Sequence, residues 1–138
     1  MSVIHRFIGA GGGWDWEGVP VHDYGPLRPG VTVRRFISRQ DESNNLEIRY
    51  FELQPGATSN FETHNYEHAV LVLRGRGSIY LGDKVHQIRF GDAIFVESDQ
   101  IHQFRAAKDE VLGFMCAVLD KDLRVTVHGE PRLVKLPE

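Results

Sequence analysis

One carboxylate and three imidazoles are spaced in this sequence as the side chains of a metal site would be. Glu62 and His64 are two positions apart, His68 follows four positions after His64, and His102 lies 34 positions after His68. Imidazole is the commonest nitrogen ligand of divalent transition metals in proteins. A carboxylate added to three imidazoles favours Mn, Fe, Ni, Co or Zn over Ca or Mg. We therefore predict a site for one transition metal ion formed by Glu62, His64, His68 and His102.

The elements that would position these side chains are short β-strands. From residue 31 onward, β-rich runs alternate with turns centred on glycines such as Gly75, Gly82 and Gly91. Many short strands with tight turns indicate a β-sandwich or β-barrel, and we find no segment with a convincing helical pattern. The expected strands cover 31–38, 46–53, 69–73, 78–81, 84–90, 93–96, 102–106 and 111–119, with a short addition at 125–127.

Strand geometry explains how the four side chains could meet. Alternate residues of a strand point to the same face, so Glu62 and His64 share a face. His68 returns to that face if a tight bend or a continued strand intervenes. His102 must come from a different strand. Neighbouring strands of a closed barrel can bring all four side chains to one internal point.

On these residues the chain resembles the cupin superfamily, whose fold is an all-β jelly-roll barrel, or double-stranded β-helix. The first cupin motif sets His, His and Glu between two glycines, and the second sets a later His after a glycine. Here Glu62 stands at the first His position and His68 at the Glu position. The matching positions are Gly56, Glu62, His64, His68 and Gly75 in the first motif and Gly91 and His102 in the second, where Glu97, Asp99 and Ala106 replace the usual Pro, Gly and Asn.

The chain is similar to one subgroup in particular, the small manganese cupins with four histidine ligands. That subgroup also has a His after a Glu, as at Glu67-His68, and a Phe and a Cys at the positions of Phe104 and Cys116. The resemblance implies one divalent metal per chain, with Mn or Fe expected first and Ni, Zn or Co as alternatives. Glu62 replaces the first histidine of the subgroup. It could be a ligand, a partner that orients a histidine, or a general base beside the metal.

Other side chains could line the metal pocket. By the resemblance these are Phe104, Phe114 and Cys116, and the alternative is that they are simply barrel core. Arg49 could point into the barrel and bind a substrate carboxylate, but we expect it at an edge or in solvent. His22 and Tyr24 could cap the mouth of the barrel.

The chain divides into an N-terminal arm (1–30), a cupin barrel (31–120) and a C-terminal extension (121–138). The arm is rich in Gly, Pro and aromatic residues, and Trp14 and Trp16 are too apolar to be left in solvent. They are expected to pack against the barrel or a second subunit, and because small cupins commonly dimerise through edge strands and arms, we predict a homodimer.

Bulk properties exclude several classes of partner. The 138 residues carry a net charge of −3, so we expect neither nucleic-acid nor anionic-lipid binding. The longest apolar run, 111–119, is too short to span a membrane, and we see no signal peptide. The single cysteine, Cys116, permits no intrachain disulfide, and the expected compartment is the cytoplasm.

We expect a metal-dependent enzyme acting on a small molecule. An octahedral metal with four protein ligands keeps two open positions, which suits an oxidoreductase of the Fe or Mn dioxygenase type, our first expectation. The same geometry suits a Lewis-acid isomerase or lyase. If Glu62 does not bind, the three histidines resemble the site of thiol and diketone dioxygenases. A non-catalytic cupin that binds a small ligand is the alternative outside enzymology.

Overall fold

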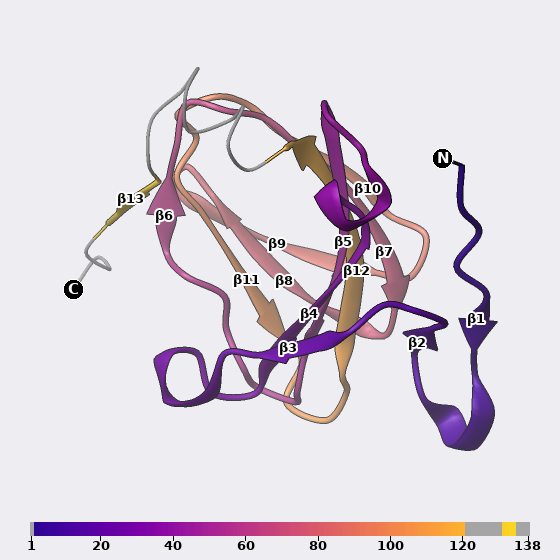
Figure 1. The fold of residues 1–138 in the computed structure, drawn as a ribbon. Helices are drawn as coiled ribbons and strands as arrows, with labels where there is room; N and C mark the ends of the chain where they lie inside the picture. The colour runs from indigo at the N-terminus through magenta and orange to yellow at the C-terminus, as the bar shows by residue number, and fades with distance from the viewer. Residues whose placement is uncertain (1, 121–130, 135–138) are drawn as a thin grey trace.

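Two β-sheets face each other in the computed structural model, which describes residues 2–120 and 131–134 (Figure 1). The larger sheet has the strand order β10-β7-β12-β5-β4-β3, and the smaller has the order β13-β6-β11-β8-β9. All strand pairs are antiparallel. The larger sheet comprises β3 (Val21–Asp23), β4 (Val31–Ile37), β5 (Leu46–Leu53), β7 (His68–Arg74), β10 (Ala93–Val96) and β12 (Leu112–Leu119).

The smaller sheet and the short elements complete the fold. The smaller sheet comprises β6 (Glu62–Thr63), β8 (Arg76–Leu81), β9 (Lys84–Arg89), β11 (His102–Ala106) and β13 (Arg132–Leu133). A separate two-stranded hairpin is formed by β1 (Phe7–Ile8) and β2 (Asp15–Trp16). Three short 3-10 helices are η1 (Ala10–Gly12), η2 (Gly25–Leu27) and η3 (Arg39–Asp41). The predicted all-β jelly-roll fold is confirmed, and each expected strand from residue 31 to 119 overlaps an observed one. The short strand expected at 125–127 lies outside the described residues.

The sequence analysis missed the shortest strands. β3 lies inside the predicted arm of residues 1–30 and yet pairs with β4, so the larger sheet begins before residue 31. β6 has only two residues, too few for an alternating pattern, although it carries Glu62. Of the predicted extension 121–138, only residues 131–134 lie within the described structure, where β13 pairs with β6. No helix in the described parts of the chain is long and apolar enough to cross a membrane.

The core lies between the sheets and follows the alternation of the strands. On β7 and β12 the inward positions are buried and most of their neighbours are more exposed, whereas on β5 the outward Tyr50 is buried as well, beneath the N-terminal hairpin. Val72 and Leu53 are fully buried, and Phe114 packs between Phe51 and Phe104 with ring centroids 5.6 and 4.2 Å away. This apolar layer surrounds one polar region, in which the predicted metal residues lie.

The N-terminal hairpin covers part of the outer face of the larger sheet. The Trp14 ring stacks on Tyr50 at a centroid distance of 5.7 Å, and Trp16 meets Phe36 at 4.2 Å. Both tryptophans are therefore packed within one chain, so covering them does not require a second subunit. The homodimer stays a prediction.

Gly113 permits this contact between the hairpin and the sheet. A Cβ atom on Gly113 would overlap the hydroxyl of the fully buried Tyr50 and lie 2.7 Å from its ring carbon Cζ. We predict that Gly113→Ala destabilises the protein by about 1–3 kcal/mol, because overpacking displaces the ring. Urea unfolding followed by tryptophan fluorescence measures this loss. Tyr50→Phe removes the hydrogen bond to the Glu52 carboxylate without overpacking, and should cost about 1.5–3 kcal/mol. An unchanged midpoint for Gly113→Ala would contradict the packing.

Candidate metal centre

Three histidines from separate places in the sequence meet between the sheets. His68 begins β7, His102 begins β11, and His64 follows directly after β6. One nitrogen of each ring lies within 4.8 Å of the other two, and the Nε2 atoms of His64 and His68 are 2.7 Å apart. All three side chains are buried. The prediction that these residues gather is thus met by the geometry of the chain.

Backbone carbonyls orient two of the imidazoles. The Nδ1 atom of His64 lies 2.8 Å from the carbonyl oxygen of Tyr66, and that of His102 lies 2.8 Å from the carbonyl oxygen of Gln100. A carbonyl oxygen only accepts hydrogen bonds, so both Nδ1 atoms carry the proton and donate it. Each Nε2 atom then holds a lone pair directed at the cluster, which is the form that a metal ligand requires.

The third imidazole, that of His68, is oriented by a contact with the sulfur of Cys116. The Nδ1 atom of His68 lies 2.9 Å from the Sγ atom of Cys116, and a proton donated there leaves its Nε2 lone pair facing that of His64. Two lone pairs 2.7 Å apart repel each other unless a proton or a cation lies between them. The donor set therefore fits a divalent transition metal, which prefers imidazole nitrogen.

Burial keeps His64 neutral. Its removal from water, together with the positive charge that His102 could carry, lowers the pKa of His64 to about 4. The ring of Tyr66 stacks flat on the His64 ring at a centroid distance of 3.8 Å and adds to this burial. Since only neutral imidazole binds metal, His64 is a competent ligand at neutral pH.

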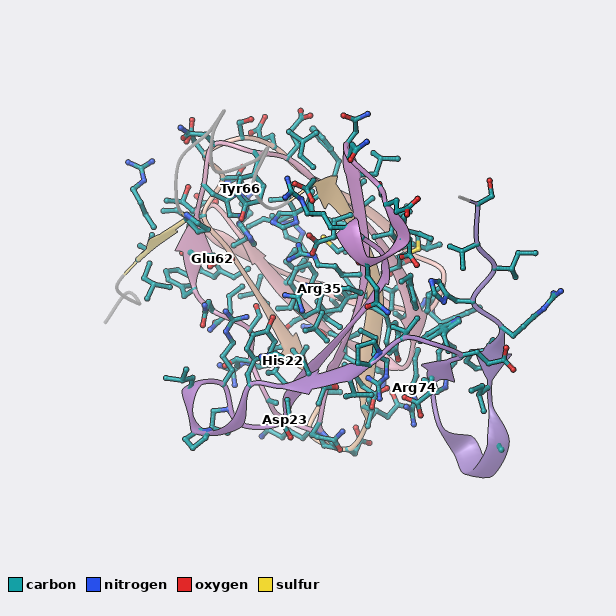
Figure 2. The ribbon with its side chains drawn as sticks, in the orientation of Figure 1. His22, Asp23, Arg35, Glu62, Tyr66 and Arg74 are labelled. Carbon is teal, nitrogen blue, oxygen red and sulfur yellow. The ribbon has the colours of Figure 1, made fainter. Side chains whose placement is uncertain are left out.

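Glu62 lies beside the cluster but is not one of its three closely spaced members. Its strand position pairs with His102, so both side chains are on the inner face, and Glu62 is half-buried in the cavity wall. Figure 2 shows Glu62 at β6 on the same side of the barrel as Tyr66. The three histidines come together without it. Its predicted role as a fourth ligand stays a prediction.

A cavity of about 250 Å³ opens beside the histidines. His68 and His102 are on its wall, and Phe104, Phe114 and Cys116, the predicted pocket residues, line it as well. The stacked rings of Phe104 and Phe114 make one wall apolar. The other described lining residues are Tyr24, Arg28, Arg35, Arg49, Phe51, Ser59, Asn60, Glu62, Tyr66 and Pro131.

The expectation that Arg49 lies at an edge or in solvent is wrong. Arg49 is 8% exposed and lines the cavity, with its Nη2 atom 3.5 Å from the Sγ atom of Cys116. Arg49, Phe51 and Leu53 are alternate residues of one strand, so their side chains face the same side of the sheet, and this alternation indicated the inward position of Arg49. Arg28 and Arg35 were not predicted at all. His22 is exposed and outside the lining, whereas Tyr24 is part of it.

Comparison with known proteins gives a family match and an enzyme relative. Residues 49–118 match the family described as "Cupin domain". The chain is 38% identical, over 107 residues, to the 1-methylthio-D-xylulose 5-phosphate methylsulfurylase of Rhodospirillum rubrum. That alignment covers 75% of this chain and 67% of the relative.

Solved structures show the same fold. A cupin-2 domain protein from Rhodospirillum rubrum is 31% identical with a TM-score of 0.75, covering 89% of this chain and 80% of its own. A cupin 2 conserved barrel domain protein from Rhodopseudomonas palustris is 28% identical with a TM-score of 0.77, covering 96% and 87%. The polyketide cyclase RemF from Streptomyces resistomycificus, at 22% identity and a TM-score of 0.78, covers 100% and 88% and supports the fold alone.

Loss of one imidazole should abolish metal retention. His64→Ala or His102→Ala leaves two of the three nitrogen donors, so metal content after dialysis should fall from about one ion per chain to near zero. Inductively coupled plasma mass spectrometry measures it. His86→Ala, which removes an exposed imidazole on β9, is the matched control and should keep its metal. Retention of a full complement by either cluster variant would rule the cluster out.

Proposed function

This chain belongs to the cupin family, and we propose that it is a metal-dependent enzyme that acts on a small carbonyl compound by Lewis-acid chemistry. The observation that carries the proposal is the convergence of three imidazole nitrogens beside a cavity whose wall includes His68 and His102. Metal sites that serve only structure are surrounded by protein ligands, whereas a catalytic site keeps a side open to substrate. His68 and His102 border both the cluster and the cavity, which supports the catalytic alternative.

The size and walls of the cavity limit the substrate. A volume of about 250 Å³ is below the usual range for drug-sized ligands, so the substrate is a small metabolite. Phe51, Phe104 and Phe114 form an apolar wall that excludes water and strengthens electrostatic interactions inside the site. A divalent metal ion, when bound, supplies a Lewis acid that polarises a carbonyl oxygen.

Glu62 is the residue we propose for proton transfer. Polarisation of a carbonyl acidifies the C–H bond on the adjacent carbon, and a carboxylate beside the metal can take that proton on an Oε atom. Glu62 is on the cavity wall next to His102, and the histidine cluster forms without it. These two facts favour its role as a base over its role as a fourth ligand.

The named relative supports a particular class of substrate. Its name describes an enzyme that acts on a methylthio-substituted xylulose 5-phosphate. Xylulose is a ketose, and carbons next to its carbonyl group can be deprotonated. A small phosphorylated ketose is therefore the first substrate class to test.

Dioxygenase chemistry is the second candidate. A site of three histidines, without a carboxylate ligand, resembles that of thiol and diketone dioxygenases, and the close cluster here contains three histidines. Oxygen uptake distinguishes this candidate from Lewis-acid chemistry, which consumes no oxygen.

Proton exchange at carbon tests the proposal directly. The Mn²⁺-loaded chain, incubated with D-xylulose 5-phosphate in D2O, should introduce deuterium next to the carbonyl group, as followed by proton NMR. Glu62→Gln should slow the exchange by about 100- to 10,000-fold, as expected for loss of a general base, while metal content stays unchanged. Glu67→Gln, which alters a nearby exposed carboxylate, is the control.

The alternatives give different results in the same assay. Oxygen consumption in an electrode chamber, with no exchange, would favour the dioxygenase. Loss of metal from Glu62→Gln would make Glu62 a ligand. A metal-loaded protein without exchange or oxygen uptake would contradict the proposed activity and leave a non-catalytic binding role.

A further inference from the structure

Arginines line the same cavity as the histidine cluster, and one of them, Arg49, shares the sulfur of Cys116 with His68. Arg35 and Arg49 are direct partners on the neighbouring strands β4 and β5, and Arg49 is in turn the partner of Cys116 on β12. Cys116 contacts His68. The inner face of the larger sheet therefore bears a polar row, His68–Cys116–Arg49–Arg35, which leads away from the metal centre. Figure 2 shows Arg35 across the barrel from Glu62.

A third arginine reaches the same cavity from the barrel mouth. Arg28 follows η2, and its guanidinium lies 4.1 Å from the centre of the Tyr24 ring, which also lines the cavity. The segment is held in place by backbone hydrogen bonds from Tyr24 to Val31 and from Val31 to Arg28. Arg28 is thus positioned by ordered backbone and not by a loose loop.

The positive charge of this wall is only partly neutralised. One carboxylate oxygen of Glu47 serves both Arg35 and Arg49, at 3.3 and 3.7 Å from their Nε atoms. The 3.7 Å distance is too long for a hydrogen bond, and the Nε atom of Arg49 is buried without a hydrogen-bond partner among the described residues. No described carboxylate pairs with Arg28 in an ion pair. Among the described lining residues the one carboxylate is Glu62, which lies beside His102.

Such an arrangement is suited to an oxyanion. Guanidinium groups bind phosphate through paired, charge-assisted hydrogen bonds, and these are strong where water is excluded. A buried, incompletely paired arginine is costly for a protein to maintain, and a bound anion removes that cost. Metal centre and arginines border one small cavity, so one metabolite can contact both.

We propose that Arg28, Arg49 and Arg35 form a subsite for the phosphate group of a phosphorylated substrate whose other end faces the histidine cluster. The inference deepens the proposed function and rests on it for the nature of the opposite end. The subsite sets specificity by charge, because an uncharged sugar of the same shape leaves the arginines unpaired. Guanidinium groups also bind other oxyanions, so a substrate carboxylate is the alternative ligand for these three arginines.

The test compares two sugars that differ only in phosphate. Isothermal titration of the Mn²⁺-loaded full chain with D-xylulose 5-phosphate and with D-xylulose measures the preference for phosphate without requiring turnover. We expect the phosphorylated sugar to bind more tightly. Arg28→Gln should weaken the binding of the phosphorylated sugar about 10- to 100-fold, because a hydrogen bond to a charged group is lost. The affinity for D-xylulose should stay the same. Arg49→Lys should also weaken the binding of the phosphorylated sugar.

Matched controls separate this subsite from binding at the metal. Arg89→Gln removes an exposed arginine on β9 and should change neither affinity. A preference for phosphate that survives Arg28→Gln and Arg49→Lys, but disappears in His102→Ala, would place the phosphate on the metal and overturn the inference. Equal binding of both sugars by the unaltered protein would also overturn it. Equal or tighter binding of D-xylonate, with the same loss in Arg28→Gln, would assign the subsite to carboxylates instead.

Because the readout is binding, the two proposals can fail separately. Absence of deuterium exchange with an intact phosphate preference would contradict the Lewis-acid activity and leave the subsite standing. Deuterium exchange without a preference for the phosphorylated sugar would contradict the phosphate subsite and leave the Lewis-acid activity standing.

Discussion

The hydrogen bonds from two imidazole Nδ1 atoms to the carbonyl oxygens of Tyr66 and Gln100 are the constraint on which this site depends. They fix which nitrogen carries the proton, and so they turn the Nε2 lone pairs of His64 and His102 toward each other. Both carbonyls lie two residues from the histidine concerned, one after it and one before it. The local backbone conformation on either side of β6 and β11 therefore prepares the ligands before any metal binds.

The larger sheet gives a second kind of order. Its inner face bears a polar row, in which His68, Cys116, Arg49 and Arg35 come from four adjacent strands. Burial of polar groups within a barrel is unfavourable unless each finds a partner. Here the partners of the arginines are the sulfur of Cys116 and the shared carboxylate of Glu47, and they leave the Nε atom of Arg49 without a hydrogen bond among the described residues. Incomplete pairing next to a cavity is a feature of a binding site, since a ligand can supply what the fold does not.

Much of this could be predicted from the sequence because it follows from alternation and spacing. The long strands were found because each combines β-branched or aromatic residues with a clear turn. His64, His68 and His102 stood out because their spacing has few structural explanations. The position of Arg49 was predicted wrongly because arginine is usually exposed. Arg49 is two residues from Phe51 on the same strand and therefore faces the cavity with it.

Other features depend on contacts that a linear pattern does not contain. The two-residue strand β6 exists because it pairs with β11 and β13, not because of its own sequence. Arg28 reaches the cavity only because η2 and the bonds around Val31 turn the chain back over the barrel mouth. The packing of Trp14 on Tyr50 joins the arm to the sheet through Gly113, a glycine whose role appears only when its neighbours are known.

Anomalous diffraction from crystals of the Mn²⁺-loaded protein would test the central claim most directly. The account predicts one anomalous peak within bonding distance of the Nε2 atoms of His64, His68 and His102, with open coordination positions facing the cavity. A fully loaded crystal whose peak lies elsewhere, or is bound through fewer than three of these nitrogens, would contradict it.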